Sequence, residues 1–479
     1  MPKPSTAPLC LGLLLALLAT TPAAAQGTPS PRVLLDAALE AHGGRDRLIA
    51  LPALAFRQET TSEVPGQGYR PGEPAEVPIS KEYLLDLAGE RGSMVQQFQF
   101  PGGYRFRNQT VFEGGSGWVI DVIRGRSGTD VRRYGAEAAA GGWAELNRAL
   151  PPLALRQAAL HGDSLTYEGL QMHGGERRHA VSYVTAGRAV TLHLDPEHHR
   201  LEALTLRTAR GPLVTSFHDY AEHGGLLLPG TLVVRQGESE GTHRVTGFDL
   251  APDLGGRFDL PAGYADAPEE TVAPAAVRLA DRVHLLTGLP GDYRSVVAEQ
   301  DDHVLLLEAP ASPAHARAIG DLLAEIAPGK PVRRVLVSHH HSDHVGGLAP
   351  FLSQGATAVV GPGGDALVRS LASEGEPAVE VVTDRRSFGA GPGRVEAYAV
   401  ETDHAETMLM FYLPEAGVLF QGDLFLLPYR GAPAASPGAF RDFARALEAR
   451  GLTPERIVSV HGGRDATMDD LRRVTRLGE

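Results

Sequence analysis

A dense group of histidine and aspartate residues stands out at residues 339–344, which read His-His-His-Ser-Asp-His and follow an apolar run. Alternate residues at the end of a strand point the same way, so His339, His341 and Asp343 can converge on one point. His344 comes directly after Asp343, so its side chain points toward a second point. Imidazole and carboxylate are the ligands that Zn²⁺ takes in catalytic sites with an open position. The spacing therefore predicts a metal centre rather than a solvated histidine-rich loop.

Three further candidate ligands stand just past apolar, strand-like runs: His404, Asp423 and His461. Seven nitrogen and oxygen ligands are too many for one tetrahedral ion, but they suit two ions that share a carboxylate and a water. A water held between two Zn²⁺ ions loses its proton near neutral pH and becomes a nucleophile. The residues thus predict a dinuclear hydrolytic centre. Iron and manganese stay open as occupants, because affinity order alone does not settle the metal.

This succession of motifs resembles the metallo-β-lactamase superfamily over about residues 278–479. The HxHxDH motif is matched in full, and the later His, Gly-Asp and His follow in the same order. The resemblance implies two zinc ions per chain, and the ligands it implies are His339, His341 and His404 for one zinc, Asp343, His344 and His461 for the second, and Asp423 as the bridge between them.

Three single residues narrow the choice among the branches of the superfamily that this chain resembles. The oxygen-reducing diiron branch usually carries an acidic residue where this chain has His341, which favours zinc. Cys10 is the only cysteine, so subfamilies with a cysteine ligand at the second zinc are excluded. Asp423 favours the lactonase-like and glyoxalase-like branches, because many β-lactamase branches lack a bridging aspartate.

The first 25 residues have the features of an export signal. Lys3 precedes the apolar stretch Leu9–Ala19, and three alanines precede Gln26, so we expect residues 1–25 to be a cleaved signal peptide. The stretch is too short to span a membrane, so we expect no stable membrane insertion. A formal net charge of −13 gives no sign of nucleic-acid binding. The predicted location is the periplasm or the outside of the cell.

About 450 mature residues exceed one hydrophobic core, so two domains are expected. The predicted linker, residues 266–276, is polar and contains proline. Before it, residues 26–265 carry short alternating runs separated by turns, with helices expected at 33–41 and 138–160. An Ala-His-Gly-Gly start at 41–44, a Gly-Gly-Leu-Leu-Leu-Pro turn at 224–229 and a Phe-Asp-Leu-Pro ending at 258–261 make this N-terminal domain similar to the lipoprotein-carrier-like half-barrels of exported bacterial proteins.

Residues 277–479 alternate strands with helices, and an αββα sandwich satisfies this order, with metals at the loop edge between two sheets. The predicted fold class is therefore α+β, with a metallo-β-lactamase sandwich preceded by an antiparallel β-rich half-barrel-like domain. No segment of the sequence predicts an oligomeric state.

The function that these features predict is an exported zinc hydrolase. A metal-bridging hydroxide would attack an ester, lactone or thioester carbonyl, and Asp343 would orient the nucleophile. One alternative is a cysteine-free metallo-β-lactamase. An alternative of another class is a lipid- or ligand-binding module with an accessory metal domain. A small acylated or apolar substrate would unite the enzymatic and binding interpretations.

Candidate substrate contacts follow the bridging aspartate, where an apolar run ends in Tyr429 and Arg430. Because the run follows a ligand, it is expected to form one wall of the cleft, with either polar tip reaching a substrate oxygen or carboxylate. The other interpretation is a surface loop in which Arg430 forms a salt bridge, and the sequence leaves both open.

Overall fold

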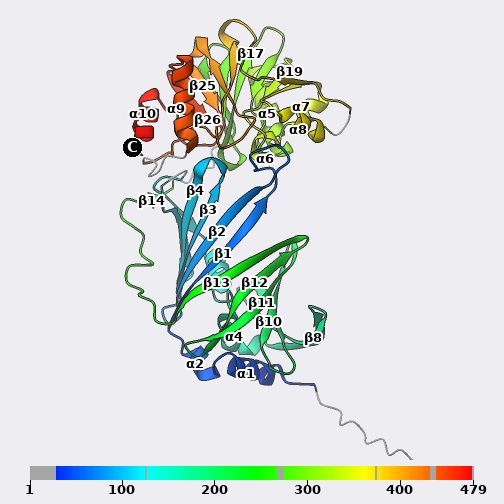
Figure 1. The fold of residues 1–479 in the computed structure, drawn as a ribbon, viewed down its shortest axis with the longest axis vertical. Coiled ribbons are helices and arrows are strands. Elements are labelled where there is room, and N and C mark those ends of the chain that lie inside the picture. Colours follow the sequence, from blue (N-terminus) through cyan, green and yellow to red (C-terminus); the bar gives the residue numbers. More distant parts are fainter. Residues whose placement is uncertain (1–27, 125–126, 268–272, 373–374, 432–437, 477–479) are drawn as a thin grey trace, which may run out of the picture.

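The computed structural model describes residues 28–124, 127–267, 273–372, 375–431 and 438–476 (Figure 1). The expected signal peptide, residues 1–25, lies outside the described residues, as does the centre of the expected linker, residues 268–272. Within the described ranges, no helix combines the length and apolar character needed to cross a bilayer. We refer to residues 28–267 as the N-terminal region and to residues 273–476 as the C-terminal region.

The N-terminal region is built on one 14-stranded sheet, whose spatial order is β14-β6-β5-β4-β3-β2-β1-β13-β12-β11-β10-β9-β8-β7. All neighbours pair antiparallel except β14 and β6, which pair parallel. The strands are β1 (Ala53–Val64), β2 (Ala75–Asp86), β3 (Arg91–Phe100), β4 (Tyr104–Glu113), β5 (Ser116–Asp121), β6 (Asp130–Tyr134), β7 (Thr166–His173), β8 (Glu176–Thr185), β9 (Arg188–Leu194), β10 (Leu201–Thr208), β11 (Gly211–His223), β12 (Leu226–Gln236), β13 (Ser239–Asp249) and β14 (Ala265–Asp266).

Helices cover one face of this sheet and complete its apolar core. They are α1 (Pro31–Ala41), α2 (Arg45–Ile49), α3 (Ala136–Leu146) and α4 (Pro151–Leu160). Leu35 and Leu39 of α1 and Leu153 of α4 are buried in one cluster with strand residues such as Phe56 and Tyr183. The expected antiparallel, β-rich architecture is therefore confirmed.

The helical stretch expected over residues 138–160 is helical in the structure, but it is divided into two helices, α3 and α4. Pro151 and Pro152 explain the break. Proline has no backbone N–H and its ring clashes with the preceding turn, so it suits the first turn of a new helix and not a helix interior. Both prolines lie at the start of α4.

The C-terminal region contains two sheets packed face to face, as the expected αββα sandwich requires. The first has the order β15-β16-β17-β18-β19-β20-β21 and the second β22-β23-β24-β25-β26. Their strands are β15 (Ala275–Ala280), β16 (Val283–Leu289), β17 (Tyr293–Glu299), β18 (Val304–Leu307), β19 (Val332–Leu336), β20 (Thr357–Val360), β21 (Val379–Val381), β22 (Arg385–Phe388), β23 (Val395–Ala399), β24 (Leu409–Leu413), β25 (Val418–Gln421) and β26 (Arg456–Ser459).

Three apolar layers hold this sandwich together. Residues from both sheets, such as Leu305 and Phe411, share the central layer. A second layer joins the outer face of the first sheet to the helices α5 (Pro313–Ile326), α7 (Ala349–Ser353) and α8 (Gly364–Leu371). A third joins the second sheet to α9 (Gly438–Arg450) and α10 (Met468–Arg476). The remaining helix, α6 (Ser342–Val345), is a single turn.

The two regions meet through the turns at one end of the 14-stranded sheet. In an antiparallel meander every second turn lies at the same end, so the turns β1–β2, β3–β4 and β5–β6 share one edge. Figure 1 shows this edge directed at the C-terminal region beside α6. Tyr104, the first residue of β4, is buried in the third apolar layer of the sandwich, and Phe100 and Phe106 pack against it. The regions therefore share a core.

Candidate metal centre

The seven residues predicted as ligands come from the ends of four strands of the sandwich. His339 and His341 follow β19, and Asp343 and His344 lie in the short helix α6. The other three follow β23, β25 and β26: they are His404, Asp423 and His461. Because β25 and β26 pair parallel, their carboxyl ends lie at the same edge, which brings Asp423 to His461. Three overlapping groups result, each with ligand atoms within 4.8 Å of one another: His339, His341 and His404; His339, His344 and Asp423; Asp343, His344 and His461.

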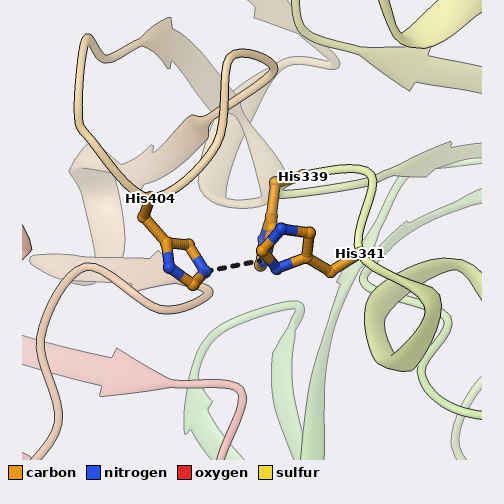
Figure 2. Close-up of side chains that lie close together, drawn as sticks. All are labelled: His339, His341 and His404. Carbon is orange, nitrogen blue, oxygen red and sulfur yellow. Dashed lines mark hydrogen bonds between the residues drawn. The ribbon is translucent and has the colours of Figure 1, made fainter. Parts of the chain in front are cut away.

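The first group consists of three imidazoles that face one another (Figure 2). His339 Nε2 lies 3.0 Å from His341 Nδ1 and 3.3 Å from His404 Nε2. All three side chains are buried. Three convergent nitrogens at this spacing match the donor set that a tetrahedral Zn²⁺ takes from protein when one position stays open.

Asp423 lies between the first group and the group of Asp343, His344 and His461, which we call the second group from here on. Its Oδ2 is 3.4 Å from His404 Nε2, whereas its Oδ1 is 3.0 Å from His461 Nε2 and 3.5 Å from His344 Nε2. Asp343 Oδ2 completes the second group, 3.4 Å from His461 Nε2 and 3.6 Å from His344 Nε2. One carboxylate therefore faces both groups, which is the position of a bridging ligand.

Two buried atoms of this cluster have no hydrogen-bond partner in the described part of the chain: His344 Nε2 and Asp423 Oδ1. A buried polar atom without a partner costs free energy, so such atoms point to a ligand that would satisfy them. These two atoms face each other across 3.5 Å. The donor set and these unsatisfied atoms both fit a pair of divalent cations.

The electrostatics of the cluster support the same interpretation. Burial and the neighbouring imidazoles lower the pKa of His341 to about 3 and the pKa of His339 well below its ordinary value, so both rings are neutral and can bind metal. Burial opposes charge on His344, but the carboxylates of Asp343 and Asp423 outweigh it and raise its pKa well above the ordinary value. The carboxylates thus attract positive charge, which a divalent cation would supply.

The carboxyl groups themselves are ionised despite their burial. Burial raises the pKa of Asp343, but His344 and His461 outweigh it and hold the pKa below the ordinary value. The same balance, dominated by His461 and His344, holds the pKa of Asp423 well below its ordinary value. The Asp343 side chain is 27 % exposed, against 14 % for Asp423, and the five histidines are buried, so solvent reaches the cluster from the side of Asp343.

Polar residues that sequence reasoning missed support the ligands from behind. Ser338 Oγ lies 3.0 Å from His339 Nδ1. The fully buried Glu308 lies 3.6 Å from His344 Nδ1, and Tyr293 donates its hydroxyl to Asp343 Oδ2 at 3.3 Å. Glu308 directly follows the apolar strand β18, so a polar residue at a strand end was a signal that could have found it. Tyr293 had no such signal.

His340, which separates two candidate ligands in sequence, is directed elsewhere. Its Nδ1 lies 2.9 Å from Thr407 Oγ1, and its Nε2 lies 3.0 Å from the carbonyl oxygen of Gly68. Both nitrogens therefore have partners outside the cluster.

Tyr429 and Arg430 lie at the contact between the two regions. Tyr429, 54 % exposed, donates its hydroxyl to Asp292 Oδ1 at 2.9 Å. The Arg430 guanidinium forms a salt bridge with Asp130 and donates to the carbonyl oxygen of Asp266 at 2.7 Å. Both acceptors of Arg430 belong to the N-terminal region. The structure therefore places this guanidinium on a salt bridge, the second of the two interpretations that the sequence left open.

Comparison with known proteins shows which proteins this part of the chain resembles. Residues 289–461 match the family model of the metallo-beta-lactamase superfamily. The hydroxyacylglutathione hydrolase of Chromohalobacter salexigens is 28% identical over 197 residues, 39% of this chain and 69% of that protein. That of Idiomarina loihiensis is 27% identical over 146 residues, 30% of this chain and only 50% of that protein. Among solved structures, the mono-zinc form of the metallo-beta-lactamase FIM-1 from Pseudomonas aeruginosa has a TM-score of 0.35 and 16% identity, covering 43% of this chain and 95% of that one.

The family match lies wholly within the C-terminal region, beginning in β16 and ending at His461. It spans all seven candidate ligands. The resemblance of residues 278–479 to this superfamily is therefore confirmed, and the proteins that this part of the chain resembles include hydrolases.

Proposed function

We propose that the protein is a dinuclear zinc hydrolase whose metals are held by the seven residues of the cluster. The observation that carries the proposal is the position of Asp423, whose two carboxylate oxygens face two separate groups of nitrogens. His339, His341 and His404 would hold one zinc, and Asp343, His344 and His461 the second. Zinc bound in this way supplies Lewis acidity and a water that is acidic enough to be a nucleophile at neutral pH.

The chain's own residues would bind and orient the reactants. Asp343, held ionised by its histidine neighbours, can accept a hydrogen bond from the attacking water through Oδ2, the oxygen that faces His461. Tyr293 donates to the same oxygen and limits its rotation. The remaining ligands are packed in the protein interior and exclude bulk water from the far side of the centre.

Among the carbonyl bonds that suit this centre, a thioester is the first to test. The two relatives reported above are named hydroxyacylglutathione hydrolases, and the acyl group of such a compound is joined to sulfur. Simple esters and lactones react by the same attack on a carbonyl carbon. The substrate is proposed to be a small, acylated molecule, and export to the periplasm stays a prediction from residues 1–25.

Metal analysis and a hydrolysis screen test the proposal together. The zinc-dialysed protein should contain about two equivalents of zinc per chain. It should hydrolyse one or more of a panel of thioesters, esters, lactones, nitrocefin-type β-lactams and phosphodiesters. Asp423→Ala should lower the zinc content and the rate, whereas Asp403→Ala, an exposed aspartate beside His404 that lies outside the groups, should change neither. A stable single equivalent in the wild type would contradict the dinuclear assignment.

A further inference from the structure

The N-terminal region reaches the metal centre through two turns. The β1–β2 turn, residues 65–74, lies over α6, where Ser342 donates its backbone N–H to Gly66 at 2.9 Å. The β3–β4 turn, Pro101–Gly103, lies against His404. Both turns belong to the sheet edge that shares a core with the sandwich. They bring polar groups from 273 to 303 positions earlier in the chain to the candidate ligands.

Backbone carbonyls of these turns accept hydrogen bonds from two ligand histidines. The Gly68 carbonyl lies 3.0 Å from His341 Nε2, and the Pro101 carbonyl lies 3.1 Å from His404 Nδ1. A carbonyl can only accept, so the proton of each neutral ring sits on the nitrogen that faces the turn. The bare nitrogens, His341 Nδ1 and His404 Nε2, are then the ones that face His339. The turns thereby select the tautomer and the ring orientation that metal binding requires.

A side chain from the same edge holds Asp343. Gln67 donates its amide to Asp343 Oδ1 at 2.8 Å. This bond fixes one carboxylate oxygen and leaves Oδ2 toward His344 and His461. Gln67 therefore contacts the second group of candidate ligands through Asp343, whereas the β3–β4 turn contacts the first group through His404.

We propose that the N-terminal region is an integral part of the metal centre, in which Gln67 and the β3–β4 turn are positioning elements for separate zinc ions. The inference rests on the proposed function, since it assumes that the cluster binds zinc. Ligands in metal sites depend on outer-shell partners of this kind, and their loss typically weakens metal binding by 10- to 100-fold.

The first test removes the Gln67 amide from the full-length protein. Gln67→Ala should weaken the binding of one zinc about 10-fold or more, measured by competition with a chromophoric chelator. Gln171→Ala, which changes an exposed glutamine on β7, is the matched control and should bind zinc like the wild type. Thermal unfolding of the metal-free proteins confirms that each variant folds.

The second test perturbs the other zinc through Gly102. This glycine has φ +77°, and an added Cβ would lie 2.8 Å from the Cβ of His404, so Gly102→Ala should displace that ring. Gly115→Ala is its matched control, because Gly115 has φ +79° in a neighbouring hairpin and its added Cβ would meet nothing within 4 Å. Backbone strain is then common to both variants, and only Gly102→Ala should weaken zinc binding.

The pattern across the variants decides the inference. Cadmium-113 resonances of the cadmium-loaded protein separate the three-histidine site from the site with fewer nitrogens. Gln67→Ala should shift and weaken the latter, and Gly102→Ala the former. Folded variants that bind both metals as tightly as the wild type would overturn the inference while leaving the proposed function intact. A wild-type protein that binds no zinc would instead overturn the proposed function itself.

Discussion

Buried histidines in the two regions differ in how their nitrogens are satisfied. In the N-terminal region, His42 is fully buried, with Nδ1 3.2 Å from the Leu227 carbonyl and Nε2 accepting the Leu201 N–H at 3.0 Å. In the C-terminal region, His344 is equally buried, yet its Nε2 has no hydrogen-bond partner in the described part of the chain and faces two carboxylates. A buried imidazole whose nitrogens are both satisfied by backbone holds structure together. A buried imidazole with an unsatisfied nitrogen that faces carboxylates is instead placed to bind a ligand.

The largest expected effect is on the hydrolytic rate, in a comparison of the neighbouring histidines His341 and His340. His341→Ala should lower the hydrolytic rate by more than about 100-fold, because loss of an outer-shell partner alone typically costs 10- to 100-fold. His340→Ala should keep most of the activity, since its nitrogens contact Thr407 and Gly68. Rate assays on proteins of equal zinc content make the comparison. Equal losses in both variants would refute the assignment of ring directions along this loop.

His42 should make the stability of the protein depend on pH. Burial lowers the pKa of His42 to about 4 from an ordinary value of 6.5. The unfolded chain therefore binds this proton at a higher pH than the folded chain, so the contribution to stability is complete above pH 6.5 and is lost as the pH falls toward 4. The expected loss is about 3 kcal/mol, from 1.36 kcal/mol per pKa unit.

His42→Gln should remove this part of the pH dependence between pH 6.5 and 4. Urea unfolding can be followed by tryptophan fluorescence, because both tryptophans of the chain, Trp118 and Trp143, lie in the N-terminal region. His198→Gln, in an exposed turn, is the control and should keep the wild-type slope. An unchanged slope in His42→Gln would show that another group causes the acid sensitivity.

The smallest effect is expected at the salt bridge between the regions. Arg430 is 40 % exposed in its pair with Asp130, and half-exposed pairs of this kind contribute about 0–1 kcal/mol. Arg430→Ala and Asp130→Asn should therefore each destabilise the protein only slightly in denaturant titrations. Both should leave KM for anionic and neutral substrates unchanged. A rise in KM of Arg430→Ala for anionic substrates alone would instead support the predicted role of Arg430 in substrate binding.

The meeting of the candidate metal ligands was predictable from sequence because they stand in the segments that follow apolar strands, where their place in the fold is set locally. His339 and Asp423 needed no knowledge of their distant partners. The sandwich was predictable for the same reason, since its strands and helices alternate along the chain. The break between α3 and α4 was also signalled locally, by Pro151 and Pro152.

Residues whose role depends on contacts with distant parts of the chain could not be predicted from sequence. Gln67 lies in a polar turn with no periodicity, and its contact with Asp343 spans 276 positions. The same holds for Pro101 and Tyr104, whose partners His404 and Asp423 are more than 300 positions away. Turn chemistry describes how the backbone reverses, and it carries no information on which surface the turn will meet.

Successive turns of the N-terminal sheet lie at opposite ends of its strands, and we expect the two sets of turns to differ in how well they tolerate insertions. The turns at the edge facing the candidate metal centre contact it directly, through the Gly68 carbonyl and through Gly102, so a change in their length should disturb the cluster. The β4–β5 turn, Gly114–Gly115, lies at the opposite end, where an added Cβ on either glycine would meet nothing within 4 Å. We therefore expect the β4–β5 turn to tolerate affinity tags, fluorophores or inserted peptides. The same insertion in the β3–β4 turn should separate the sheet from the candidate ligands that it contacts.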